Sequence, residues 1–63
     1  MEKLKSLTNK QYDQIVDYAR KRHMTINGYQ SISGGILLNN SVHDGLWGET
    51  MTELFEKIDK FTN

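Results

Sequence analysis

Hydrophobic and polar positions follow a helical repeat near both ends of the chain. Apolar residues recur at three- and four-residue spacing from Tyr12 to Ala19, and they do so again from Met51 to Phe61. This spacing places apolar side chains along one stripe of an α-helix, and that stripe needs a surface to cover it. The pattern predicts two amphipathic helices, near residues 9–23 and 51–61.

Both predicted helices start with a capping box. Thr8 is followed by Gln11 and Thr50 is followed by Glu53, each three residues later. In a capping box the hydroxyl accepts a hydrogen bond from a first-turn amide, and the longer side chain reaches back to the backbone. These pairs predict where the two helices begin.

The middle of the chain alternates short apolar segments with pairs of residues that favour turns. Residues 29–33 and 36–39 have strand-like content and flank the dipeptide Gly34-Gly35, which predicts a hairpin. A third strand over residues 42–47 is less well defined, because Asp44-Gly45 can either break it or turn it back. Two or three antiparallel strands are therefore expected between the helices.

This order of elements predicts an α+β fold in which two amphipathic helices pack on a small two- or three-stranded antiparallel sheet. The 63 residues are expected to form one domain, residues 1–63, with a flexible N-terminus over residues 1–7. A core of this size rarely supplies more than about 3 to 5 kcal/mol. The sequence has no Cys, which excludes disulfides. The remaining sources of stability are favourable local interactions within the helices and turns, or oligomerisation.

Targeting signals are not visible in the sequence. The first residues contain no apolar run of signal-peptide length, and no stretch approaches the length of a membrane span. We expect a cytoplasmic protein that makes no membrane contact. Frequent Lys and Asn with scarce Arg are typical of a small accessory protein from an AT-rich bacterium or its mobile elements.

Catalytic chemistry is not predicted. His43-Asp44 is the one adjacent imidazole and carboxyl pair, and neighbours in a turn rarely face each other. His23 and His43 are the only imidazoles and fit no metal-ligand spacing, and no Gly-rich run has phosphate-loop spacing. We expect no enzyme activity, no cofactor and no metal.

Charge is divided unevenly along the chain although the net charge is zero. Residues 1–23 hold six basic and three acidic residues, a net of +3, and residues 24–63 hold two basic and five acidic, a net of −3. Arg20, Lys21 and Arg22 form a basic cluster that offers an alternative function, nucleic-acid binding. Asp17 lies within reach of this cluster and can neutralise part of it.

The leading functional hypothesis comes from the uncharged segment, residues 24–43. An edge strand without charged side chains favours pairing with another strand. The sequence therefore predicts a protein–protein interaction or accessory module that can self-associate, with Tyr29, Gln30, Ser31 and Trp47 as partner-binding residues. Trp47 is expected to be a core residue under the second helix, and its alternative role is that of an exposed interface anchor.

Overall fold

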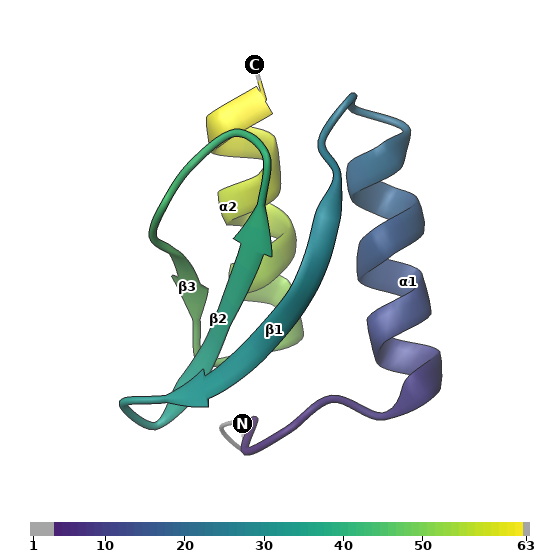
Figure 1. Cartoon of the computed structure of the whole chain (residues 1–63). Coiled ribbons are helices and arrows are strands. Elements are labelled where there is room, and N and C mark those ends of the chain that lie inside the picture. Colours follow the sequence, from purple (N-terminus) through teal and green to yellow (C-terminus); the bar gives the residue numbers. More distant parts are fainter. Residues whose placement is uncertain (1–3, 63) are drawn as a thin grey trace.

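The computed structural model describes residues 4–62. Its elements are α1 (Asn9–Arg20), β1 (Ile26–Ile32), β2 (Gly35–Asn40), β3 (Leu46–Gly48) and α2 (Met51–Thr62). The strands form one antiparallel sheet in the order β1-β2-β3, α2 lies behind the sheet, and α1 runs beside β1 (Figure 1). The predicted α+β fold is confirmed, and the sheet has three strands.

The core lies between the two helices and one face of the sheet. Both predicted helical stripes contribute to it, with Ile15 and Ala19 from α1 and Leu54 and Ile58 from α2 fully buried. The other buried apolar residues are Leu7, Met24, Ile26, Ile36, Leu38 and Leu46. Each helix has 12 residues, and neither of these described helices is long and apolar enough to cross a bilayer.

The two capping boxes form, with one difference from the expected geometry. Thr8 Oγ1 accepts from the Gln11 amide at 3.1 Å, and the Gln11 side chain accepts from the Thr8 amide at 3.0 Å. At the second box the Glu53 amide donates to Thr50 Oγ1 at 3.1 Å. The Glu53 carboxylate accepts from the Glu49 amide at 2.8 Å, one residue before the position that a standard box uses.

The first helix ends three residues earlier than predicted. Residues 21–23 form a turn, in which the Arg22 amide donates to Ala19 O and the His23 amide to Arg20 O. His23 has a φ of 66° and is exposed, so it is not on the buried stripe where the helical repeat placed it. Its left-handed conformation reverses the chain toward β1, and Met24 fills the core position instead.

The first strand begins three residues earlier than predicted. Asn27-Gly28, predicted as a turn, lies inside β1 at a bulge between Ile26 and Tyr29, where Gly28 has a φ of 118°. The hairpin loop is also displaced by one residue. Ser33 and Gly34 have φ values of 53° and 77° and form the loop, because Gly35 already pairs with Ile32.

Residues 4–7 pack against the domain, although the sequence predicted a flexible N-terminus over residues 1–7. Leu7 is buried, and the Leu4 amide donates to Glu49 O at 2.7 Å. The Ser31 hydroxyl donates to Lys5 O. Apolar burial and these bonds hold the segment, while residues 1–3 lie outside the described part of the chain.

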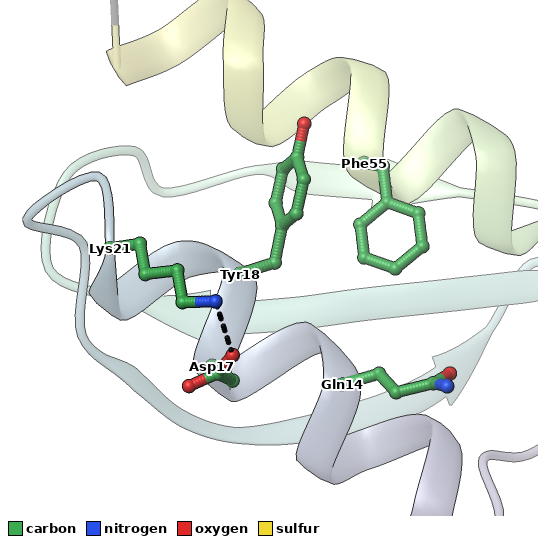
Figure 2. Close-up of a pocket in the computed structure, with 5 residues that line it drawn as sticks. All are labelled: Gln14, Asp17, Tyr18, Lys21 and Phe55. Carbon is green, nitrogen blue, oxygen red and sulfur yellow. Dashed lines mark ion pairs between the residues drawn. The ribbon is translucent and has the colours of Figure 1, made fainter.

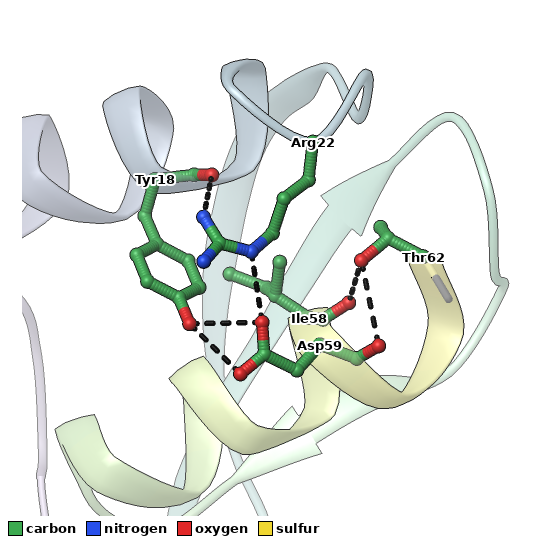
Figure 3. A network of polar contacts seen from close by, with 5 residues as sticks. All are labelled: Tyr18, Arg22, Ile58, Asp59 and Thr62. Atoms are coloured by element: carbon green, nitrogen blue, oxygen red, sulfur yellow. Dashed lines mark hydrogen bonds and ion pairs between the residues drawn. The ribbon is translucent and has the colours of Figure 1, made fainter.

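A polar cluster, here called the helix clasp, joins the end of α1 to α2 and consists of Tyr18, Arg22 and Asp59 (Figure 3). The Tyr18 hydroxyl donates to the Asp59 carboxylate at 2.8 Å, and Arg22 Nε donates to Asp59 Oδ1 at 2.8 Å. The Arg22 guanidinium also stacks over the Tyr18 ring, 3.6 Å from its centroid. The hydrogen bond to Asp59 raises the pKa of the Tyr18 hydroxyl, burial acts in the same direction, and the charge of Arg22 opposes them.

The helix clasp predicts a coupled change in ionisation and stability. Asp59→Ala should lower the pKa of Tyr18 toward its ordinary value and slightly reduce the free energy of unfolding, a small effect because both charged partners are partly exposed. Because the folded-state pKa is raised, the wild-type contribution is present below pH of about 10 and is lost as pH rises through the folded-state pKa. Ring ¹³C NMR titration and urea unfolding measure the two effects.

Asp13→Ala is the matched control, since it removes the same charge from an exposed position on α1. The pKa of Tyr18 should be the same in Asp13→Ala as in the wild-type chain. Equal titration curves in wild type and Asp59→Ala would contradict the role given to this carboxylate.

Candidate interaction surface

Trp47 lies on the sheet face that the helices leave uncovered. Its neighbours Leu46 and Gly48 face the helices: Leu46 is fully buried, and a Cβ on Gly48 would lie 3.1 Å from Leu54 Cδ2. Side chains alternate along a strand, so Trp47 points the other way. It is half-buried there, and its indole Nε1 donates to Ile32 O at 2.9 Å. The expected position under the second helix is therefore wrong, because the alternation of β3 places Leu46 there instead.

The strand register gathers further side chains around Trp47. Gln30 pairs with Leu37, and Leu37 pairs with Trp47, which makes one row across all three strands. Ile32, exposed at 44%, pairs with Gly35, and the Trp47 ring lies over Gly35. We call the surface made by Gln30, Ile32, Leu37 and Trp47 the open face.

The open face belongs to a sheet without charged side chains. None of the residues in β1, β2 or β3 is Asp, Glu, Lys or Arg. An uncharged surface with a central Trp has the composition of the desolvated centre of a protein–protein interface, where aromatic residues are enriched and charges are depleted. This arrangement can bury apolar area against another protein without desolvating an ion.

The four residues predicted to bind a partner divide between the two sides of the sheet. Gln30 and Trp47 share the open face. Tyr29 packs near α1 with its ring centroid 5.6 Å from that of Tyr12, and its hydroxyl bonds with the backbone of Leu7. The Ser31 hydroxyl is bonded to the N-terminal segment, so Tyr29 and Ser31 hold this segment in place.

Ile32 and Leu37 were missing from the residues predicted from sequence. A signal for Leu37 was present, because three consecutive apolar residues, Ile36 to Leu38, cannot all point to one face of a strand. The signal for Ile32 was weaker. The face of the sheet on which Ile32 lies depends on the register between β1 and β2, and the displaced hairpin loop sets that register.

The predicted basic cluster is partly engaged within the domain. Lys21 pairs with Asp17 at 3.2 Å, and Arg22 belongs to the helix clasp, where its NH1 group also donates to Tyr18 O. Arg20 is exposed at the end of α1. Two of the three side chains proposed to contact nucleic acid thus have partners inside the chain.

A shallow groove of about 320 Å³ runs between the outer sides of α1 and α2 (Figure 2). It is lined by Gln14, Asp17, Tyr18, Lys21 and Phe55. The rings of Tyr18 and Phe55 pack with centroids 4.6 Å apart, and Asp17 and Lys21 neutralise each other at the rim. The groove is therefore a weaker candidate than the open face, because its ionic groups already have partners.

The imidazole of the adjacent pair His43-Asp44 contacts Gly45 and Phe61. His43 Nδ1 accepts from the Gly45 amide at 3.0 Å, and its ring stacks on Phe61 at 3.9 Å between centroids. Over residues 4–62 the structure has no group of three or more His, Cys, Asp or Glu side chains placed to hold a metal ion. The geometry gives His43 a role in holding the loop before β3 against α2.

The fold and surface define an α+β domain with an open three-stranded antiparallel sheet backed by two helices. Comparison of the chain with models of protein families, with curated proteins and with solved structures finds no match.

Proposed function

We propose that the protein is a cytoplasmic protein–protein interaction module that self-associates through its open face. The observation that supports this is the position of Trp47, whose indole lies beside Leu37 and Ile32 on a sheet face without charge. The occupant is a second copy of the chain. Two such faces can meet without ionic repulsion, the Gln30 amide can pair with its own copy, and the net charge of zero does not oppose association.

The size of the open face sets the expected strength of association. Two strands about 20 Å long and a third about 10 Å long, spaced about 4.8 Å apart, give an area on the order of 250 Å². A stable interface buries about 800 Å² per partner. Self-association through the open face alone is therefore expected to be weak and transient, in the micromolar range or weaker.

The experiment introduces a charge on the open face. Ile32→Lys should weaken self-association at least about tenfold, because like charges facing each other across a two-fold axis cost several kcal/mol. Val42→Lys is the matched control: Val42 is also β-branched and is 47% exposed, against 44% for Ile32, but it lies in the loop before β3. Sedimentation velocity from micromolar to millimolar concentration measures the change.

A second variant separates the open face from the neighbouring strand edge. Trp47→Ser removes the central side chain from β3 and adds no charge to β1, so it too should weaken self-association while circular dichroism shows a folded domain. A wild-type chain that stays monomeric at millimolar concentration contradicts the proposal. So does equal weakening by Val42→Lys.

The alternative function, nucleic-acid binding by Arg20, Lys21 and Arg22, has a different signature. A complex with mixed-sequence DNA or RNA that weakens steeply with salt, and that is lost when these three residues become Gln, would favour it. The same complex should be insensitive to Ile32→Lys.

A further inference from the structure

A second hollow, here called the edge groove, lies between the C-terminal half of α1 and the start of β1. It has a volume of about 230 Å³ and is lined by Val16, Arg20, Met24, Thr25 and Ile26. Val16, Met24 and Ile26 give it an apolar part, Thr25 adds a polar side chain, and Arg20 from the last turn of α1 adds a cation. The edge groove can therefore take an apolar side chain next to an anionic group.

The edge groove adjoins the outer edge of β1, which residues 5 and 7 flank through their bonds to Ser31 and Tyr29. In the sheet of residues 4–62, β1 is an outer strand and β2 is its only strand neighbour. The bulge between Ile26 and Tyr29 interrupts the ladder, so regular geometry runs from Tyr29 to Ile32. An uncharged edge of this kind accepts an added strand, whose main-chain bonds give affinity while side-chain pockets give selectivity.

The edge groove has one charged residue without an ion-pair partner in the described chain, Arg20. Arg20 makes no ion pair with any residue of the described chain, because the nearby Asp17 pairs with Lys21. Asp13 lies seven residues before Arg20, on the same side of α1 and two turns away. Lys10, three residues before Asp13, carries the opposite charge, so Arg20 at the edge groove is the unpaired charge of this flank.

We propose that the edge groove binds an extended acidic segment of a partner protein, which adds to β1 as a fourth strand. The segment pairs with Tyr29–Ile32 in the antiparallel direction, the commoner one in sheets. Its C-terminal end then reaches Ile26, places an apolar side chain in the edge groove and sets an Asp or Glu carboxylate on Arg20. This site is separate from the open face and does not depend on self-association.

The experiment selects ligands from a phage-displayed library of random decapeptides. Selection on the wild-type chain should enrich peptides in which an acidic residue follows an alternating apolar strand pattern. Selection on Arg20→Glu should enrich Lys or Arg at the acidic position instead. Lys10→Glu, which makes the same charge change near the start of α1, is the control and should give the wild-type pattern.

One selected peptide then tests the contacts directly. Arg20→Gln should weaken its binding about tenfold, as expected for loss of a charged hydrogen bond, and Lys10→Gln should leave binding unchanged. NMR shift changes should follow Val16, Met24 and β1. Trp47→Ser should bind the peptide like wild type, because Trp47 is not part of the edge groove. The peptide result therefore does not depend on self-association.

Three results would each overturn the proposal. The first is that no peptide is enriched, and the second is that Arg20→Glu selects the same acidic pattern as wild type. The third is that the NMR shift changes are centred on the open face.

Discussion

Leu54→Ala is expected to leave the domain largely unfolded. Leu54 is fully buried between α2 and the sheet, directly opposite Gly48. Truncating a buried Leu costs about 2 to 5 kcal/mol, and a core this small supplies only about 3 to 5 kcal/mol. The loss therefore approaches the whole stability of the fold. Urea titration followed by far-ultraviolet circular dichroism measures it.

The chain offers a control that removes the same atoms from the other side of the sheet. Leu37→Ala truncates a half-buried Leu on the open face, where the side chain is already partly in water. It should cost less than half as much as Leu54→Ala and leave a folded domain with weakened self-association. Equal destabilisation by the two variants would show that the open face is not open in solution.

Gly35→Ala is expected to destabilise the domain by about 1 to 3 kcal/mol, because it overpacks a closed contact. A Cβ on Gly35 would lie 2.7 Å from Gly48 O and 2.7 Å from Trp47 Cζ2, closer than real Cβ atoms approach heavy atoms. The indole can move, but the neighbouring carbonyl belongs to the sheet backbone. Relief of the clash should displace the Trp47 ring and break its bond to Ile32 O.

Two measurements check this prediction. Thermal unfolding gives the stability, and the indole N–H proton shift reports the bond to Ile32 O. Gly45→Ala is the control, since a Cβ there would meet nothing closer than His43 Cε1 at 3.8 Å. It should change stability by no more than about 0.5 kcal/mol. An unchanged indole signal in Gly35→Ala would mean that Gly35 does not set the position of Trp47.

The helices could be predicted from sequence because their signals are local. The capping residue Thr8 and its partner Gln11 are three positions apart, and the apolar stripes repeat within each helix. The end of α1 was missed because no local pattern marks the left-handed conformation of His23, a residue type that adopts it only occasionally. The start of β1 was missed because Asn-Gly favours a turn, whereas here it forms a bulge inside the strand.

The candidate surface was less predictable, because it depends on register and on contacts between distant segments. Leu46 and Trp47 are both apolar neighbours, so alternation requires them to face opposite sides but does not say which one is buried. The helices decide this by covering Leu46. In the same way Arg22 looked like part of a basic patch, because its partner Asp59 is 37 residues away in the sequence.

The order of pairing in the sheet has a consequence for how the chain folds. Each strand pairs with the next one along the chain, so the hairpin and the third strand close only short loops. The helix clasp, by contrast, joins Tyr18 to Asp59 across 41 positions, and closing that loop costs more entropy. The sheet is therefore expected to organise the folding transition state, with the clasp forming afterwards. Interactions that form after the transition state slow unfolding without speeding folding, so the clasp lengthens the time for which the native domain persists.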